Sequence, residues 1–507
     1  MAEFYIDGRS LTIEQVVKIA DDPSIQVKIA PDALADIERA AAAVHQFVLD
    51  GKIAYGITTG FGAFKDRLIP VDQVEQLQEN IILSHAVGVG PHLDDRTVRA
   101  MILIRANTLA KGHSGIRVKT LELLLELLNK NLLPVIPSKG SLGASGDLAP
   151  LAHMSLPLLG FGQIKMNGEI VDSADAFQKV GLEPIRLAAK EGLALTNGTT
   201  MMTAIAALGI DAAEALINTA DCAGALGLEA QNGTLRAFLP QIHQSRPQNF
   251  QQETAEHIRS LLQDSQFTRP DSSRNVQDAY TLRCIPQVHG AVRNALSYAR
   301  SVVEIELNSV TDNPLLFFDQ NDQVEIISGG NFHGEPLALA MDFLAIALAD
   351  LGNMAERRIA KLIDNNTEHY PSFLAAEGGL NSGFMLLQYT AAALASENKT
   401  LAHPSSLDSI PSSGNVEDHV SMGANAALHC AQVLDNVNAI IAIELMSAAQ
   451  AIDFRLQKSP ELQLGSGTKI AMRKIREAVP FFEHDEFLQP SMQKLIELVK
   501  KKTFAFC

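Results

Sequence analysis

The chain contains 507 residues, of which 47% are hydrophobic and 5% aromatic, with no tryptophan and a formal net charge of −17. This length exceeds one ordinary hydrophobic core and corresponds to roughly three domain-sized units or to one extended helical architecture. Because the apolar residues are mostly Leu, Ile, Val and Ala, the composition favours helices packed on helices. The acidic balance, without a basic stripe, excludes nucleic acid as an expected partner.

The N-terminal residues predict no secretory signal, because no basic region precedes a long apolar run. The longest uncharged, apolar-leaning run, residues 193–210, contains an Asn-Gly pair and several threonines, which predicts a poor membrane span. The cysteines are Cys222, Cys284, Cys430 and Cys507. None has CxxC spacing, so no metal or redox motif is predicted, and scattered thiols suit a reducing compartment. We expect a cytoplasmic protein that does not bind membranes.

Apolar residues spaced three and four apart predict several helices in the N-terminal quarter of the chain. The predicted ranges are 33–49, 71–86, 96–109 and 118–127. In the following segment, 134–162, Gly, Ser and Pro interrupt the pattern. Such punctuation predicts unusual backbone dihedral angles that the surrounding protein must hold in place.

Two short hairpins are expected in the otherwise helical remainder. One covers residues 163–171 around Asn167-Gly168, a pair typical of a tight hairpin turn, and the other covers 315–327. Long, nearly uncharged helices are predicted at 199–228, 288–309, 336–363, 383–400 and 419–453. Helices that are apolar around most of their surface must be buried in a bundle or in a subunit interface.

The segment GSLGASGDLAP, residues 140–150, holds the most distinctive chemistry of the chain. If Ala144-Ser145-Gly146 bends sharply, the unhindered Gly146 amide nitrogen can attack the Ala144 carbonyl carbon and close a five-membered ring with loss of water. Loss of the Ser145 hydroxyl then leaves an exocyclic methylene, giving an electrophilic methylidene-imidazolone. No ordinary side chain is electrophilic, so such a group would supply a function usually imported with a cofactor.

Two other interpretations of the tripeptide compete with cyclisation. A plain glycine-rich turn is the usual meaning of Ala-Ser-Gly alone. A G-x-S-x-G nucleophile elbow fails, because Asp147 stands where its second glycine must be. The longer segment, with Asp-Leu-Ala-Pro after the tripeptide, closely resembles the self-processing loop of the histidine/phenylalanine/tyrosine ammonia-lyase family.

Further blocks resemble this family in the same order along most of the chain. They are YGITTGFG at 55–62, EGLALTNGT at 191–199, VQDAYTLRC at 276–284, TDNP at 311–314, SGGNFHG at 328–334, SENK at 396–399 and EDHVSM at 417–422. The final fifty or so residues carry little that matches. Several matching blocks in family order make the resemblance very specific.

The resemblance implies a mainly α-helical long-helix bundle of the ammonia-lyase/aspartase-like type with small β-hairpins. We expect an N-terminal domain at 1–225 that carries the methylidene-imidazolone loop. Residues 226–507 are expected to form the central long-helix bundle and a helical C-terminal section. The resemblance also implies a homotetramer whose active sites are assembled from three subunits, and long apolar helices agree because they need partners.

The reaction implied by the resemblance is non-oxidative elimination of ammonia from an α-amino acid. The group formed from Ala144, Ser145 and Gly146, without an external cofactor, would capture the amine, and a positioned base would remove the β-proton. Tyr55 matches the family's base. Because a phenol has a reference pKa near 10, we expect cationic or helix-terminal surroundings to lower it. Tyr280 matches the tyrosine that lies beside the ring and the leaving amine.

Other matched residues imply substrate binding. Arg283 matches the residue that grips the substrate carboxylate, which a guanidinium can bind bidentately. Asn197 and Gln277 match amides that hold the carboxylate or the ring oxygen, and Phe332 matches an aromatic residue near the ring. Ordinary structural roles remain open for these positions: a packed loop tyrosine for Tyr55, an ion pair for Arg283, core packing for Phe332.

The family resemblance favours L-histidine as substrate and urocanate as product. His85, in a Ser-His pair typical of histidine lyases, can hydrogen-bond an imidazole, although a satisfied core histidine is the ordinary alternative. Glu417 lies in a block of the histidine-specific type, and a buried carboxylate facing a phenyl ring would be unsatisfied. Met385 matches a residue that lines the same pocket. Thr58, Thr200 and Val416 depart from the usual histidine-lyase pattern.

Two alternatives to histidine elimination therefore remain. A tyrosine or phenylalanine ammonia-lyase, or a 2,3-aminomutase, would use the same prosthetic group on another substrate. A catalytically silent helical scaffold would retain an uncyclised tripeptide.

Overall fold

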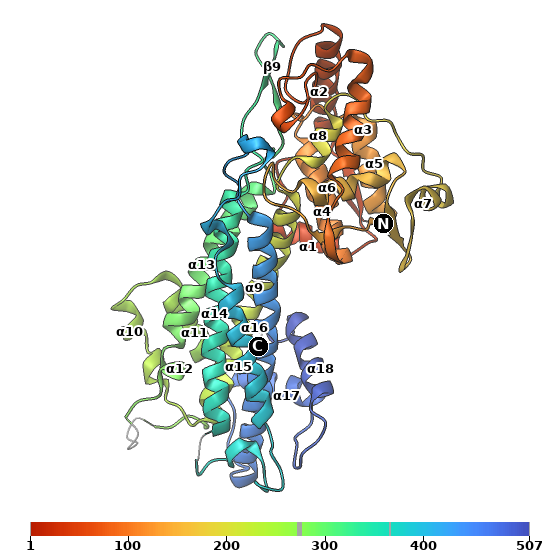
Figure 1. The fold of residues 1–507 in the computed structure, drawn as a ribbon. Coiled ribbons are helices and arrows are strands. Elements are labelled where there is room, and N and C mark those ends of the chain that lie inside the picture. Colours follow the sequence, from red (N-terminus) through yellow and green to blue (C-terminus); the bar gives the residue numbers. More distant parts are fainter. Residues whose placement is uncertain (1, 271–275, 365–366, 506–507) are drawn as a thin grey trace. The chain divides into compact units, whose positions relative to one another are not determined.

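The structure is a computed structural model that describes residues 2–270, 276–364 and 367–505. The protein is mainly helical (Figure 1). The α-helices are α1 (Ile13–Asp21), α2 (Pro31–Leu49), α3 (Val74–His85), α4 (Asp95–Ala110), α5 (Val118–Asn129), α6 (Leu148–Ser155), α7 (Ser173–Val180), α8 (Glu191–Thr196), α9 (Thr200–Ala230), α10 (Pro240–Gln244), α11 (Asn249–Leu261), α12 (Tyr280–Arg283), α13 (Ile285–Glu306), α14 (Glu335–Asp364), α15 (Met385–Leu401), α16 (Gly423–Lys458), α17 (Ser466–Ala478) and α18 (Gln489–Lys500).

Short 3-10 helices and small β-sheets connect the helices. The 3-10 helices are η1 (Gly62–Phe64), η2 (Val71–Gln73), η3 (Leu156–Leu159), η4 (Leu235–Phe238), η5 (Ser372–Leu374), η6 (Ser405–Leu407) and η7 (Ser413–Asn415). The strands are β1 (Glu3–Ile6), β2 (Gln26–Ile29), β3 (Val89–His92), β4 (Leu133–Pro134), β5 (Pro137–Lys139), β6 (Gln163–Met166), β7 (Glu169–Asp172), β8 (Leu315–Phe318) and β9 (Val324–Ile327). The β1–β2 pair is parallel, whereas β3–β5, β4–β6–β7 and β8–β9 are antiparallel.

The chain divides into two compact units, each built from three stretches of sequence. The first unit comprises Met1–Leu208, Arg300–Met341 and Pro404–Leu428. The second comprises Gly209–Ala299, Asp342–His403 and His429–Cys507. Four of the five boundaries between the units fall inside α9, α13, α14 and α16, and the fifth, at 403/404, lies between α15 and η6. The division into domains 1–225 and 226–507 stays a prediction.

Helix packing in the first unit determines the positions of the loops that connect its helices. Helix α4 begins at an Asp94 N-cap whose carboxylate accepts a hydrogen bond from the Thr97 N–H at 2.9 Å, and it is then buried along most of its length. It packs against α1 and α5. Helices α3, α6 and α8 pack against one another. As a result, the C-terminal ends of α3 and α8 and the loop before α6 belong to one compact arrangement.

The core of the second unit is formed by long helices that lie side by side, including α14, α15 and α16 (Figure 1). A Cβ atom on Gly352 of α14 would lie 3.0 Å from Val437 of α16 and 3.5 Å from the amide of Asn398 of α15. Glycine therefore permits this close approach. Arg358 of α14 and Glu444 of α16, both fully buried, form an ion pair between the helices.

Among the residues that the structure describes, three helices have the length and apolar composition of membrane-crossing helices. They are α9, α14 and α16, and 78%, 61% and 89% of their most apolar windows are buried inside the protein. This burial agrees with the expectation that long apolar helices form a core. The prediction that residues 193–210 would make a poor membrane span holds only in part. Helix α9 includes most of that run, and it has the length and apolar composition of a membrane-crossing helix.

The mainly helical fold is confirmed, and so are the predicted hairpins, which are β6–β7 and β8–β9. The prediction of irregular backbone throughout 134–162 is wrong in part, because α6 and η3 occupy residues 148–159. Proline in the first turn of a helix lacks only an N–H that would be unpaired there, so Pro150 and Pro157 do not prevent helices. The helix expected from residue 419 begins at Gly423. Cys507 lies outside the described residues, and the other cysteines form no disulfide bond among the described residues.

Candidate active site

An open pocket of about 1210 Å³ lies within the first unit. Its lining includes six side chains that the sequence proposed for the site. They are Tyr55, His85, Ser145, Asn197, Phe332 and Glu417. These residues come from separate parts of the chain and meet because α3, α6 and α8 pack together and the later stretches of the unit fold against them.

The tripeptide forms the tight turn that cyclisation requires. Gly143 and Gly146 pair across the turn as an antiparallel bridge, so Ala144 and Ser145 occupy its tip. Ser145 has φ +55° and Gly146 has φ +79°, both in the left-handed region that costs little for glycine and more for serine. The Ser141 hydroxyl donates to the Gly146 carbonyl at 3.2 Å and accepts from the Gly143 N–H at 3.3 Å.

The end of α8 holds this turn in place. The Ser145 carbonyl oxygen accepts hydrogen bonds from the Asn197 amide at 2.9 Å and from the Gly198 N–H at 3.1 Å. A Cβ atom on Gly146 would lie 2.2 Å from the Gly198 carbonyl oxygen, so only glycine fits there. The other amide atom of Asn197, Oδ1, is buried without a hydrogen-bond partner among the described residues. A bent tripeptide whose Ser145 carbonyl receives two donors fits a ring formed from Ala144–Gly146, because that carbonyl would become the ring oxygen.

Asp147, directly after the tripeptide, is a fully buried carboxyl group. Burial raises its pKa to about 6, although the Met202 N–H and the Ser141 hydroxyl donate to its oxygens at 3.0 Å each and the Arg105 charge also lowers it. Arg105 is also fully buried, and its Nε and Nη1 atoms have no hydrogen-bond partner among the residues that the structure covers. The tripeptide therefore lies against a buried, charged support.

Tyr55 lies in the loop after α2, half-buried at the pocket wall. Its hydroxyl oxygen accepts a hydrogen bond from the Gly62 N–H at 3.2 Å, and its ring meets Phe61 edge-on. The expected lowering of the Tyr55 pKa is not produced by the first unit. Burial raises that pKa, Glu417 raises it further, and only the Gly62 N–H opposes them.

His85 is the last residue of α3, and its ring faces the same pocket as Glu417. The His85 Nδ1 atom lies 2.9 Å from the Ser84 hydroxyl, which fixes the ring orientation. Burial lowers the His85 pKa, while the Glu417 charge opposes this. One Glu417 carboxylate oxygen accepts from the Ser412 hydroxyl at 3.0 Å. The pocket thus carries an imidazole and a carboxylate near each other.

Several lining residues were not singled out from the sequence. Asn313 donates to the Ser328 hydroxyl at 3.1 Å and accepts from the Gly329 N–H at 2.6 Å, and so holds the glycine-rich segment that leads to Phe332. Ser413 accepts from the Ala63 N–H at 3.1 Å and joins the Tyr55 loop to the Glu417 segment. Asn313 stood in a matching block, which was a usable signal, whereas Ser413 had none.

Four proposed residues belong to the second unit and are not among the residues lining this pocket: Gln277, Tyr280, Arg283 and Met385. Tyr280 is 70% exposed, and the Arg283 guanidinium carbon lies 4.6 Å from the centre of its ring, a cation–π contact. The Arg283 Nε atom is buried without a hydrogen-bond partner among the described residues. Gln277 is exposed, and Met385 begins α15. No structural ion pair of the described residues occupies Arg283, which leaves its donors for a ligand.

Comparison with known proteins identifies the class to which this fold and pocket belong. A family model described as aromatic amino acid lyase matches residues 11–477. The chain therefore belongs to the aromatic amino acid lyase family and is a lyase.

Individual relatives cover nearly the whole chain. It is 58% identical to a histidine ammonia-lyase of Chloroflexus aurantiacus, over 99% of this chain and 97% of that one. The crystal structure of histidine ammonia-lyase from Trypanosoma cruzi superposes with a TM-score of 0.91 at 39% identity, covering 99% and 94% of the two chains. Tyrosine aminomutase from Streptomyces globisporus superposes with a TM-score of 0.92 at 37% identity, covering 99% and 98%.

Proposed function

We propose that the protein eliminates ammonia from L-histidine and releases urocanate. The observation that carries this proposal is one pocket that combines the bent Ala144-Ser145-Gly146 turn, the Tyr55 hydroxyl and a polar His85–Glu417 wall. The relatives named histidine ammonia-lyase at high identity support the same reaction.

The prosthetic group is proposed to be 4-methylidene-imidazol-5-one, formed autocatalytically from the tripeptide without an external cofactor. When formed, it supplies an electrophile that captures an amine and makes nitrogen a better leaving group. Asn197 and Gly198 would hold it through the Ser145 carbonyl, as they hold the turn. Gly146 allows the close approach that this support requires.

Removal of the β-proton is assigned to Tyr55. A general base must stand within hydrogen-bond reach of the proton and be deprotonated when it acts. The Gly62 N–H, which donates to the phenol oxygen at 3.2 Å, stabilises the phenolate form. Tyr280 is assigned to the amine side of the reaction, where its hydroxyl would donate to or accept from the departing nitrogen.

Substrate orientation is assigned to the carboxylate-binding groups. Arg283 can hold the substrate carboxylate with two parallel N–H donors, which fixes orientation as well as charge. Asn197 and Gln277 would add hydrogen bonds from their amide groups. Phe332 and Met385 would form apolar walls around the substrate. Each of these residues would contribute by positioning the substrate. Holding a reactant and a catalytic group in the right geometry supplies much of the rate enhancement.

The preference for histidine is assigned to His85 and Glu417. An imidazole ring can pair with both groups, whereas a phenyl ring would give the half-buried carboxylate no partner beyond the Ser412 hydroxyl. A tyrosine or phenylalanine lyase or aminomutase remains the second candidate, because a tyrosine aminomutase shares this fold at 37% identity. A panel of L-histidine, L-tyrosine and L-phenylalanine separates the candidates, with urocanate, 4-hydroxycinnamate, cinnamate and β-amino acids measured as products.

His85→Leu tests the assignment of the ring pocket. We expect kcat/KM for L-histidine to fall by about 10- to 100-fold, because the imidazole loses a hydrogen-bond partner in a partly buried pocket. Activity on L-phenylalanine should rise relative to L-histidine. His92→Leu, at an exposed position of the same unit, is the matched control. Unchanged histidine activity in His85→Leu would refute the role of His85.

The pH dependence follows from the raised pKa of Tyr55. The base acts only when deprotonated, so a pKa above 10 means that kcat/KM should rise by about tenfold per pH unit from neutral pH upward. Rates measured across neutral and alkaline pH, at saturating and low substrate, check this. A plateau beginning near about pH 7 would contradict it and would show that groups outside the first unit lower the pKa.

The partners are proposed to be L-histidine and further copies of the chain in a homotetramer with shared active sites. Large exposed apolar side chains on the second unit support self-association, because an interface between subunits would remove them from water. They are Tyr298, Phe343, Ile346, Leu386 and Tyr389. The protein is also proposed to be cytoplasmic and to bind neither membranes nor nucleic acid. In this proposal the long apolar helices form the protein core and do not cross a membrane.

Shared active sites can be tested by complementation. Tyr55→Phe and Arg283→Lys should each be nearly inactive. When the two are co-expressed, about a quarter of the sites should receive both native residues if each site draws them from different subunits. Activity should therefore return to about that fraction of wild type, in particles of four times 54.7 kDa. No recovery in mixed tetramers would place both residues in one chain.

A further inference from the structure

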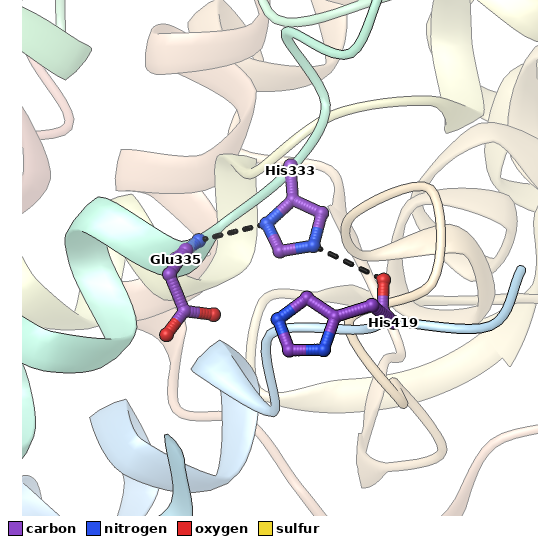
Figure 2. A group of neighbouring side chains, drawn as sticks. All are labelled: His333, Glu335 and His419. Atoms are coloured by element: carbon purple, nitrogen blue, oxygen red, sulfur yellow. Dashed lines mark hydrogen bonds between the residues drawn. The ribbon is translucent and has the colours of Figure 1, made fainter. Parts of the chain in front are cut away.

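We propose that His333, Glu335 and His419, which lie next in the chain to segments carrying the pocket residues Phe332 and Glu417, form a binding site for a zinc-type divalent cation (Figure 2). This inference is independent of the reaction proposed above. One potential ligand atom from each side chain lies within 4.8 Å of the other two. All three residues belong to the first unit. No metal-ligand spacing is visible here in the residue order, because His419 is distant from the other two residues in the chain.

The hydrogen bonds of His333 leave its Nδ1 atom as the ligand. The backbone N–H of Glu335 donates to Nδ1 over a long 3.4 Å, so Nδ1 carries the lone pair and the proton is on Nε2. A cation would displace this long hydrogen bond to bind the Nδ1 lone pair. The Nε2 atom lies 3.2 Å from the His419 carbonyl oxygen, to which it donates. A metal-binding histidine usually donates its other N–H to a carbonyl in this way, which fixes the tautomer and orients the ring.

The other two ligands complete a three-residue set. Glu335 is the first residue of α14. In the view of Figure 2, its carboxylate and the His419 ring both lie below the His333 ring. The rings of His333 and His419 are stacked with centres 5.7 Å apart. Zinc–ligand bonds of about 2.0–2.2 Å require ligand atoms about 3.4 Å apart, so the side chains must approach by up to about 1.5 Å. His419 is exposed and Glu335 only partly buried, so side-chain rotation can supply this movement.

The donor set selects the class of cation. Two imidazoles and one carboxylate, with a fourth position open to water, are a familiar arrangement for zinc. Magnesium and calcium prefer oxygen ligands, whereas imidazole suits zinc, cobalt, nickel and copper. We therefore assign the site to zinc or a cation of similar preference.

A cation bound by His333, Glu335 and His419 would connect two segments that carry pocket residues. His333 follows the pocket residue Phe332, and His419 is two residues after the pocket residue Glu417. Their segments already touch, because a Cβ atom on Gly334 would lie 3.0 Å from the Ser421 hydroxyl. A bound cation would join the Phe332 segment to the Glu417 segment and so brace two walls of the pocket.

Cobalt(II) titration of the full-length protein, freed of metal by chelation and dialysis, tests the site. We expect a single cobalt ion per chain with the strong visible absorption of four-coordinate cobalt, no sulfur charge-transfer band, and displacement by zinc. His419→Ala should weaken binding by more than the roughly 10- to 100-fold that outer-shell changes cause. His333→Ala should do the same, and Glu335→Gln should weaken binding less than either.

His45→Ala and His92→Ala, both exposed histidines of the same unit, are matched controls that should bind cobalt like the wild type. Because His419 is exposed, its variant should fold normally, which circular dichroism checks. A weak, six-coordinate spectrum, or unchanged cobalt affinity in His419→Ala, would overturn the proposal. In that case Glu335 serves only as a favourable charge at the start of α14.

Discussion

Ser145→Ala is expected to lower kcat for L-histidine by at least about 10³-fold, more than the loss of a single transition-state hydrogen-bond donor usually costs. The reason is that the serine hydroxyl is the group whose elimination creates the electrophilic methylene. Alanine can adopt the same turn, and the contacts of the residue 145 carbonyl with Asn197 and Gly198 involve only the backbone at that position. Stability should therefore change little.

Intact mass spectrometry separates the chemical steps. The wild-type chain should weigh about 36 Da less than its sequence predicts, for two lost waters, and Ser145→Ala should lose only the first of them. Gly146→Ala should lose neither, because its Cβ would lie 2.2 Å from the Gly198 carbonyl oxygen and the turn cannot form. Ser24→Ala, on the surface of the same unit, is the control. Full activity in Ser145→Ala, or a wild-type mass equal to that of the sequence, would exclude the proposed prosthetic group.

Tyr55→Phe is expected to lower kcat by about 10²- to 10⁴-fold, the usual contribution of a positioned general base. Phenylalanine keeps the ring and its edge-on contact with Phe61, while the Gly62 N–H loses its acceptor. Because the tripeptide is untouched, the mass deficit of about 36 Da should remain, unlike in Ser145→Ala. The KM should change less than kcat, since the hydroxyl acts on the proton and not on the carboxylate.

Two measurements distinguish a lost base from a damaged pocket. A substrate deuterated at the β-carbon should react more slowly with the wild type if proton removal limits the rate, and the pH rise of kcat/KM should disappear in Tyr55→Phe. Tyr5→Phe, an exposed tyrosine on β1, should behave like the wild type. A decrease smaller than about tenfold in Tyr55→Phe would assign the base to another group.

Local sequence patterns predicted the elements well where burial and turn chemistry agree. The apolar spacing in α2, α4 and α5 and the Asn167-Gly168 turn between β6 and β7 correspond to the structure within a few residues. The pattern failed at 148–159, where proline and glycine indicated a loop but proline at the start of a helix is tolerated. The parallel β1–β2 pair was not predicted, because its short strands pair across an intervening helix.

Motifs in the sequence singled out candidate site residues but not their environment. The direction of the Tyr55 pKa came out opposite to the expectation, since burial and Glu417 depend on segments distant from the Tyr55 loop. Asp147 stood in the matched loop segment, but nothing in the sequence indicated its burial, and Arg105 behind the tripeptide had no signal beyond being an isolated charge.

The sequence by itself determined which chemical groups the chain can offer and in which order they occur. The tripeptide, its neighbours and the ordered blocks indicated an electrophile, a phenol base and an arginine for a carboxylate, because these functions belong to residue types. Only the tertiary structure decided that the turn bends with Gly146 against Gly198, that His85 and Glu417 face one pocket, and that His333, Glu335 and His419 meet. Such meetings depend on packing between α3, α6 and α8 and on long-range segments, which local patterns do not encode.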